Sequence, residues 1–486
     1  MNHSLLTISD ITKKLKNKEI SVIEIVKSYL QKIEKLNKTI NAYITVCNID
    51  AEKYSRVLQE KLNSGEKLPV LFGIPMALND NIVTRNTLTT CASKMLGNFI
   101  PPYNSTVNER LHDSGAILLG KLNMDEFAMG NSNESSYFGA VKNPWDFDRV
   151  PGGASGGAAA AVASGLACFA LGSDTGGDIR HPSSFCGVVG LKPTYGLVSR
   201  YGLVACASSM DQIGPITRNV EDCAVVLNAI TGYDPKDSTS AVIKYPDYTA
   251  FLGEDIGGLK IGIPKEYLDK GDNGEVNQRV FDACKIFKSL GAEIVEVSLP
   301  TTQYAIPAYY IISSAEISSN LARYDGIKYG YRAKDCQDIE DLYQQSRAQG
   351  FGSDVKRRIL TGTYALSSER YEEYYKKALK VRRLIFEDYE NAFNHVDVII
   401  SPTTPDTAFK IGEKFNEPKM CSNYEYTVSV SLAGLCAMSV PIGKDSEGLP
   451  IGMQLIGKRY GEGTLIKVAN KFEEACNFVK TEFIDL

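Results

Sequence analysis

The central stretch between Pro151 and Pro182 constrains the fold more than any other part of the sequence. It begins PGGASGGAAAAVASG and ends ALGSDTGGDIRHP, so two glycine clusters flank a segment of small residues. Glycine lets backbone lie close against backbone or ligand, and a loop that enters a helix presents free N–H groups to an anion. We predict a buried helix that runs into a strand, together with a ligand-binding or oxyanion loop. Tight helix–strand packing alone is the alternative.

Common ligand motifs do not explain this stretch. The sequence contains no G-x-x-x-x-G-K-[ST] phosphate loop and no dinucleotide-binding fingerprint. The triplet at 174–176 matches the Asp-Thr-Gly of aspartic proteases, and 113–115 could supply a second copy. Such a site needs paired carboxylates in a predominantly β protein, whereas Asp113 ends a predicted helix in a helix-rich chain. We therefore reject that assignment.

Alternating strand and helix patterns predict an α/β protein. The N-terminal segment, residues 1–65, is expected to be helical. Buried strands are predicted further along the chain, at 116–119, 260–263, 294–297 and 396–401. No repeat and no long linker divides the chain, so we expect one domain over residues 1–486, with a catalytic-type core at 66–486. Its centre should be a large mixed sheet covered by helices on both faces.

The composition is that of an average globular chain. The 53 Lys and Arg against 58 Asp and Glu give a formal charge of −5, with 43% hydrophobic and 23% charged residues. These values exclude a disordered chain and a nucleic-acid binder that relies on bulk positive charge. The four histidines are scattered and the eleven cysteines form no C-x-x-C, which argues against a metal site and favours reduced core thiols. With no signal peptide or membrane span in the sequence, we expect a cytoplasmic protein.

Several long segments resemble the amidase signature family. They lie at 71–83 (LFGIPMALNDNIV), 121–130 (KLNMDEFAMG), 152–202 and 210–224 (MDQIGPITRNVEDCA). Further segments at 19–37, 308–332 and 351–371 are similar to one branch, the A subunits of tRNA-dependent amidotransferases. The resemblance covers nearly the whole chain and implies the amidase-signature fold.

The resemblance also implies a catalytic triad whose positions are all changed here. In the family a lysine, a bridging serine on a cis peptide and a nucleophilic serine hydrolyse an amide. The corresponding positions carry Asn79, Ala154 and Asp178. Asn79 cannot act as a base near neutral pH, Ala154 has no hydroxyl to relay a proton, and Asp178 is a carboxyl group where an alcohol is needed. We expect glutamine hydrolysis by the family route to be lost, and changes at several separate sites favour a naturally diverged paralogue.

Other site positions implied by the resemblance are partly retained. Loop-framework and oxyanion residues are present at Ser155, Asp174, Thr175, Gly176 and Gly177. Glutamine contacts are expected from Tyr309 and Arg358, with Tyr310 and Arg357 as the alternative register. Changed positions are Tyr424, which stands where the family carries the aspartate that holds the amino group of glutamine, and Asn131 and Asn133. Glu425, next to Tyr424, is a candidate for a shifted substitute for that aspartate.

The change to Asp178 has two interpretations. Loss of the lysine and gain of a carboxylate make the site about two charges more negative if all these groups are ionised, which favours an ammonium or amine ligand. Alternatively, the Asp178 side chain folds onto the N–H groups of residues 175–177 and fills the oxyanion site.

The expected function is that of an A-subunit-like component of a heterotrimeric amidotransferase-type complex that has lost glutamine hydrolysis. B-type and C-type subunits are the implied partners, with charged tRNA bound through the B-type partner and no membrane contact. No cofactor is expected on this chain, because ATP and Mg belong to the B-type partner in the resembled complex. A different amine donor or an amino acid is a candidate ligand. The alternatives are an active glutamine-dependent subunit of the A type, or an amidase with altered chemistry that uses Asp178 with Ser155.

Overall fold

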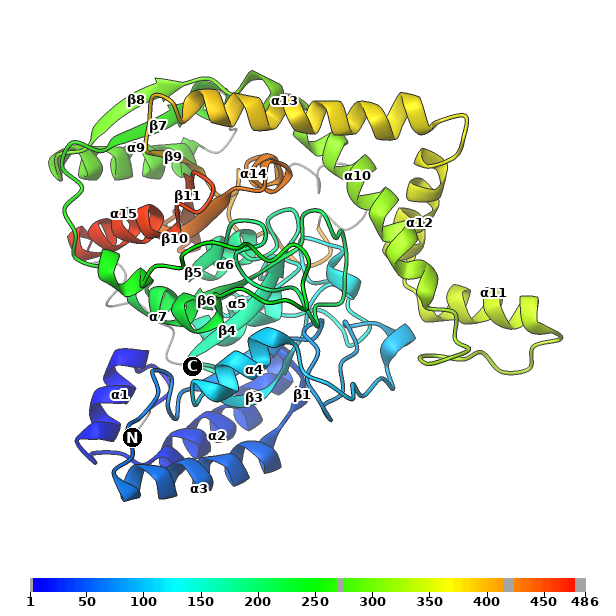
Figure 1. Cartoon of the computed structure of the whole chain (residues 1–486), viewed down its shortest axis with the longest axis horizontal. Coiled ribbons are helices and arrows are strands. Elements are labelled where there is room, and N and C mark those ends of the chain that lie inside the picture. The colour runs from blue at the N-terminus through cyan, green and yellow to red at the C-terminus, as the bar shows by residue number, and fades with distance from the viewer. Residues whose placement is uncertain (1–2, 269–273, 414–423, 477–486) are drawn as a thin grey trace.

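One mixed sheet forms the centre of the computed structural model, which describes residues 3–268, 274–413 and 424–476 (Figure 1). The strands are β1 (Tyr43–Val46), β2 (Pro75–Asn79), β3 (Ile117–Leu122), β4 (Phe169–Asp174), β5 (Val189–Lys192), β6 (Gln212–Thr217), β7 (Lys260–Pro264), β8 (Glu293–Val297), β9 (Val398–Pro402), β10 (Cys436–Lys444) and β11 (Pro450–Gly457). Their order in the sheet is β1-β3-β2-β4-β6-β5-β10-β11-β9-β7-β8. β2 runs parallel to β3 and β4, and β7 runs parallel to β8 and β9, while the remaining neighbours are antiparallel.

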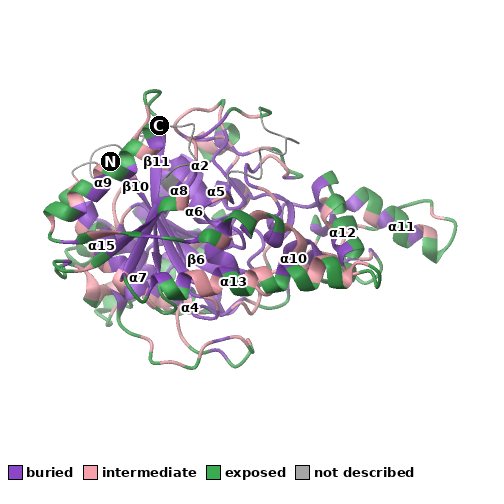
Figure 2. Cartoon of the chain, turned by 90° about the horizontal axis from the view of Figure 1, so that it is seen from above, coloured by how far each residue is buried: buried purple, intermediate pink, exposed green. Residues whose placement is uncertain are grey.

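Helices pack over this sheet. They are α1 (Ile8–Lys16), α2 (Val22–Ile40), α3 (Asn48–Ser64), α4 (Thr106–Asp113), α5 (Gly156–Ala163), α6 (Arg180–Cys186), α7 (Val220–Ile230), α8 (Lys265–Leu268), α9 (Gly274–Ser289), α10 (Ala305–Asn320), α11 (Ile339–Gly350), α12 (Ser353–Ala365), α13 (Lys377–Ala392), α14 (Val428–Ala433) and α15 (Glu462–Ala475). Short helical turns lie at Lys94–Leu96, Glu126–Ala128, Tyr248–Phe251, Pro300–Tyr304, Leu321–Arg323 and Tyr371–Lys376. The central strands are buried and the edge strands β1 and β8 are partly exposed, whereas α11 and α12 extend away from the sheet with exposed faces (Figure 2).

The glycine-rich centre forms the predicted buried helix and strand, α5 and β4. Every residue of both elements is buried. Small residues are required here because the elements lie very close together. A Cβ on Gly157 would lie 2.2 Å from the carbonyl oxygen of Asn123, and a Cβ on Gly172 would lie 2.7 Å from Ser155 Oγ. Larger side chains would force the helix away from the sheet.

The predicted α/β architecture, a large mixed sheet covered by helices, is confirmed. The expected strands correspond to β3, β7, β8 and β9, with ends shifted by a few residues. The N-terminal segment contains the helices α1, α2 and α3, but the expectation that residues 1–65 are helical missed β1, which pairs with β3 at Tyr43 and Leu122. The sequence YITV is rich in aromatic and β-branched residues, and the edge of β3 supplies its hydrogen-bond partners.

The described part of the chain contains no helix long and apolar enough to cross a membrane. Within the same residues no group of three or more His, Cys, Asp and Glu side chains is arranged to hold a metal ion. The cysteines that the structure describes are free thiols, and most of them are buried. Cys421 lies outside the described residues.

Candidate functional site

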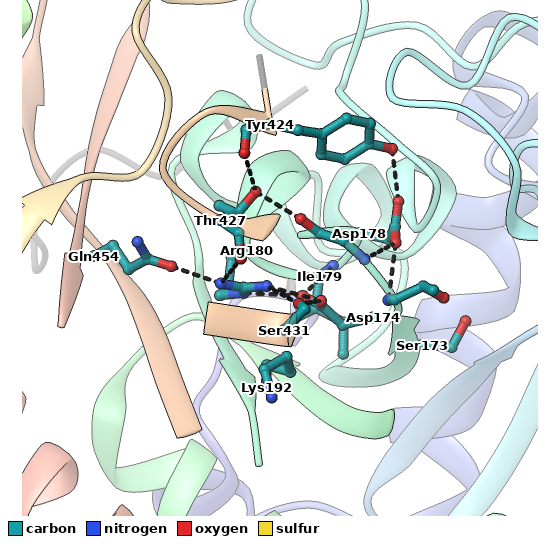
Figure 3. Close-up of polar contacts among 12 residues, drawn as sticks. Ser173, Asp174, Asp178, Ile179, Arg180, Lys192, Tyr424, Thr427, Ser431 and Gln454 are labelled. Atoms are coloured by element: carbon teal, nitrogen blue, oxygen red, sulfur yellow. Dashed lines mark hydrogen bonds and ion pairs between the residues drawn. The ribbon is translucent and has the colours of Figure 1, made fainter. Parts of the chain in front are cut away.

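The loop between β4 and α6 carries the residues that the sequence assigns to the site. β4 ends at Asp174 and α6 begins at Arg180, and these two buried side chains form an ion pair with a distance of 2.9 Å between Nη2 and Oδ1 (Figure 3). Arg180 also donates to the carbonyl oxygen of Thr427, to Gln454 Oε1 and to Ser431 Oγ. Arg180 therefore fixes the end of β4 to the C-terminal part of the chain.

The Asp178 side chain occupies the N–H groups of its own loop. Its Oδ2 accepts hydrogen bonds from the backbone N–H groups of Thr175 and Gly176, each at 2.9 Å. Its Oδ1 accepts from the N–H of Ala154 at 3.2 Å and lies 2.9 Å from the hydroxyl oxygen of Tyr424. Of the two interpretations of Asp178, the structure agrees with the one in which its side chain folds onto the N–H groups of its own loop, here those of Thr175 and Gly176.

The electrostatics of Asp178 oppose a role as an anion for an ammonium ligand. Burial, followed by the charge of Asp174, raises the pKa of Asp178 to about 7. Burial also acts on Asp174, but the Arg180 guanidinium and its hydrogen bonds lower the pKa of Asp174 below its ordinary value. Asp178 is thus only partly ionised at neutral pH, and both of its oxygens already have hydrogen-bond partners.

Asn79 and Ser155 form a buried contact beside this loop. Asn79 is the last residue of β2, and its Nδ2 donates to Ser155 Oγ at 2.8 Å. The Ser155 hydroxyl in turn donates to the carbonyl oxygen of Ser173 at 3.1 Å. The proton of Ser155 is therefore directed to the backbone and faces no base, so Ser155 lacks the activation that a nucleophile requires.

Ala154 occupies the position expected for the bridging serine. The peptide bond between Gly153 and Ala154 is cis, as the resemblance implies for this position. The Ala154 side chain is buried in an apolar cluster that includes Met124 and Phe127. Gly153 packs against Asp125, since a Cβ on Gly153 would lie 2.1 Å from Asp125 Oδ2. The cis peptide is present, and within the part of the chain that the structure describes no hydroxyl group hydrogen-bonds to the side chains of both Asn79 and Asp178.

The aromatic wall of the site contains Tyr309 and Tyr424. Their ring centroids are 6.0 Å apart, and a Cβ on Gly176 would lie 2.7 Å from Tyr309 Cζ. Arg358 lies over the ring of Tyr310 at 3.9 Å. Arg358 also acts electrostatically on Tyr309 and Tyr424, which places its charge beside the loop.

The structure separates the two alternative registers. Tyr309 contacts the loop, whereas Tyr310 supports Arg358. Arg357 points to the surface, with 57% of its side chain exposed, and pairs with Asp354. The register with Tyr309 and Arg358 is therefore the one that faces the site.

The remaining predicted residues have different surroundings. Glu425 is half-buried near Tyr267 and Tyr426, whose pKa values are raised by burial and further by the Glu425 charge. Asn133 is buried and joins two segments, because its N–H donates to Asp125 Oδ2 at 2.9 Å and its Oδ1 accepts from the N–H of Gly157 at 3.0 Å. Asn131 is buried next to Gly153.

Thr427 and Asp211 hold the loop but were not predicted from the sequence. Thr427 Oγ1 donates to the carbonyl oxygen of Gly176 at 2.7 Å, and a Cβ on Gly177 would lie 2.3 Å from that hydroxyl oxygen. Thr175 Oγ1 donates to Asp211 Oδ1 at 2.7 Å. Asp211 lies in segment 210–224, which resembles the amidase signature family, and that resemblance could have indicated a role for it. Thr427 is separated from the loop by about half the chain, and its role could be found only from the fold.

Comparisons with known sequences match this geometry. The amidase family model covers residues 24–466. The A subunit of glutamyl-tRNA(Gln) amidotransferase from Caldanaerobacter subterraneus subsp. tengcongensis is 57% identical over 474 residues, which are 97% of each chain. The protein of the same name from Carboxydothermus hydrogenoformans is 55% identical over 98% of each chain.

Comparisons with solved structures agree. The A subunit of glutamyl-tRNA(Gln) amidotransferase from Thermotoga maritima has a TM-score of 0.81 at 39% identity, with 97% of this chain and 95% of that chain covered. The peptide amidase of Stenotrophomonas maltophilia has a TM-score of 0.83 at 30% identity, with 96% of both chains covered. With its fold, its loop and these relatives all in agreement, the chain belongs to the amidase signature family.

Proposed function

We propose that this chain is the A-type subunit of a tRNA-dependent amidotransferase that assembles in the cytoplasm with B-type and C-type subunits. Full-length identity of 57% to a protein named as the A subunit of glutamyl-tRNA(Gln) amidotransferase supports the assignment. We also infer that residues 1–486 form one amidase-signature domain, since β1 from the N-terminal segment joins the same sheet as the rest. Charged tRNA, ATP and Mg are assigned to the B-type partner.

Within that role, we propose that the chain does not hydrolyse glutamine by the family mechanism and is a diverged paralogue. The observation that carries this proposal is the Asp178 carboxyl group on the N–H groups of Thr175 and Gly176, where a tetrahedral intermediate would place its oxyanion. Loss of a nucleophile, a base and a proton relay together leaves only the small rate enhancement due to binding. The chain would then serve as a scaffold, with a different amine donor or none.

The alternative is an active glutaminase subunit that supplies ammonia. The names of the relatives favour it, because four proteins that are 53–57% identical to this chain all carry the name of the amidotransferase A subunit. The residues at 79, 154 and 178 favour the first proposal. An amidase that uses Asp178 with Ser155 has less support, because the Ser155 hydroxyl donates to the backbone of Ser173.

The test is a gain-of-function series in the complex assembled with candidate B-type and C-type subunits. Asn79→Lys, Ala154→Ser and Asp178→Ser together restore the triad, and Tyr424→Asp is added in a second variant to restore a partner for the amino group of glutamine. We expect ammonia release from glutamine to rise on the order of 10³-fold or more in at least one of these variants. The matched control carries Asn79→Lys and Ala154→Ser but keeps Asp178, and should stay at the wild-type level. A wild-type rate equal to that of the restored variants would support the active glutaminase instead.

A further inference from the structure

The hydroxyl group of Tyr424 faces two acceptors but carries one proton. One acceptor is the carbonyl oxygen of Gly130, and the other is Oδ1 of Asp178 at 2.9 Å. A phenol donates a single hydrogen bond and can accept others. If Asp178 were ionised, Tyr424 would donate either to it or to Gly130, and two oxygen atoms would face each other with no proton between them.

We propose that Asp178 is held as a neutral carboxylic acid, with Tyr424 as the residue that positions its proton. In this arrangement Asp178 Oδ1–H donates to the Tyr424 oxygen, and Tyr424 donates to the carbonyl oxygen of Gly130. Each short contact then contains one proton. The N–H of Ala154, at 3.2 Å, still reaches a lone pair on Oδ1.

A neutral Asp178 has the hydrogen-bonding pattern of a primary carboxamide. Its Oδ2 accepts from the N–H groups of Thr175 and Gly176, as a scissile carbonyl oxygen would. In the proposed arrangement its protonated Oδ1 donates to the Tyr424 oxygen 2.9 Å away, as an amide nitrogen would. The chain thus carries a built-in mimic of an amide side chain in its own oxyanion site. The inference concerns the state of Asp178 and holds whether or not the complex turns over glutamine, so its failure and the failure of the proposed function are distinguishable.

The charged groups around Asp178 are consistent with a neutral acid. Within residues 3–268, 274–413 and 424–476 no cation forms an ion pair with Asp178, and the carboxylate of Asp174 lies on the same loop. Cys206 and Tyr309 also face Asp178, and burial raises the pKa of both, so they are neutral at neutral pH. Arg180 pairs with Asp174, Lys192 also acts on Asp174, and Arg358 acts on Tyr309, Tyr424 and Cys206.

One more carboxyl group approaches from the loop that follows β3. Asp125 acts on Tyr424, and burial raises the pKa of Asp125 to about 6. Asp125 accepts hydrogen bonds from Asn133 and Ser135, so it is satisfied without Tyr424. Ionisation of Asp125 adds negative charge near Tyr424 and does not stabilise an ionised Asp178.

The direct test measures the titration of Asp178 in full-length protein labelled with ¹³Cγ-aspartate. The Asp178 resonance is identified by its loss in Asp178→Asn. In Tyr424→Phe the acid loses the acceptor of its proton, so the neutral form is destabilised and we expect the titration midpoint to move to lower pH. If Tyr424 instead donates to a carboxylate, its removal moves the midpoint to higher pH. An upward shift, or no shift, overturns the proposal.

Two further variants guard against indirect effects. Tyr426→Phe removes a buried hydroxyl group from the same segment and should leave the Asp178 midpoint unchanged. Asp178→Asn keeps a carbonyl oxygen for Thr175 and Gly176 and an N–H donor for Tyr424, and loses only the contact with the N–H of Ala154. We expect its melting temperature to be close to that of the wild type at pH 5 and higher than that of the wild type at pH 8. A variant that is destabilised to the same extent at both pH values would contradict a neutral acid.

Discussion

Asp174 and Asp178 are buried carboxyl groups on one short loop, yet their surroundings have opposite effects. Asp174 pairs with Arg180, whose side chain is wholly buried with it, and its pKa is lowered. Asp178 has backbone N–H groups and a tyrosine hydroxyl for partners, and its pKa is raised to about 7. Hydrogen bonds from neutral donors do not offset the loss of water around Asp178, whereas a cation does so for Asp174.

The two aspartates belong to different parts of the site: Asp174 to the ion-paired framework of the loop, and Asp178 to the predicted site positions. The framework comprises Asp174, Arg180 and the residues that Arg180 binds, and it fixes the loop to β11 and to the segment before α14. The predicted site positions 79, 154 and 178 make fewer long-range contacts than Arg180, although Asp178 accepts hydrogen bonds from the N–H groups of Thr175 and Gly176. The loop, the cis peptide and the fold are present with Asn79, Ala154 and Asp178 at these positions.

The largest loss of stability should come from breaking the buried ion pair between Arg180 and Asp174. Arg180→Met leaves Asp174 buried without its cation, which typically costs about 3–5 kcal/mol of unfolding free energy. Urea unfolding followed by circular dichroism measures this. The matched control is Arg357→Met, which removes an arginine with 57% of its side chain exposed and should cost less than about 1 kcal/mol. Equal losses for the two variants would show that burial of the Asp174 pair is unimportant.

An intermediate effect should appear in the pH dependence of stability. The folded-state pKa of Asp178, about 7, lies above its unfolded value, so the native state binds the extra proton between about pH 4 and 7. The contribution of Asp178 to stability is therefore present at low pH and is lost as the pH rises through about 7. Relative to Asp178→Asn, the wild type should lose on the order of 4 kcal/mol across that window, at about 1.4 kcal/mol per pKa unit.

Asp174 should behave in the opposite way. Its pKa is lowered on folding, so its contribution is present above its unfolded pKa and is lost as the pH falls below that value. The unfolding free energies of the wild type and Asp178→Asn should be measured from pH 4 to 8. Their difference gives the contribution of Asp178 to the pH dependence, because the other titrating groups are common to both proteins. If the unfolding free energies of the wild type and Asp178→Asn changed with pH in parallel, the pKa of Asp178 would not be raised on folding, and the proposed difference between Asp174 and Asp178 would be wrong.

The smallest effect should come from the hydrogen bond between Thr427 and the carbonyl oxygen of Gly176. Thr427→Val keeps the shape of the side chain but removes the donor to the carbonyl oxygen of Gly176. We expect a loss of about 1 kcal/mol in unfolding free energy. Thr427→Ser, which retains the hydroxyl group, should recover most of it. No loss in the valine variant would show that the loop is held by Arg180 alone.

The sequence predicted the parts of this molecule that local pattern determines. Small residues between glycines predicted α5 and β4, because only such residues permit the close approach at Gly157. Strand β1 was not predicted, since its four residues acquire a strand conformation by pairing with β3. Local preference is a weak signal for so short an edge strand.

The sequence proposed which residues belong to the candidate site, but it could not indicate which of them contact one another. The family resemblance supplied Asn79, Ala154 and Asp178 as a group, and the structure brings Asp178 to Ala154 and Asn79 to Ser155. The family resemblance could not indicate that the Tyr424 side chain reaches Asp178, because those residues are 246 positions apart. The direction of a side chain across such a separation depends on the packing of the whole chain.

If the Asp178 carboxyl group occupies the oxyanion site, as proposed, glutamine is not hydrolysed there. The most direct measurement is ammonia release from glutamine by the wild-type chain assembled with its B-type and C-type partners, compared with the partners alone. We predict the same rate in both samples. Ammonia release clearly above that of the partners alone, and abolished by Asp178→Asn, would contradict the claim.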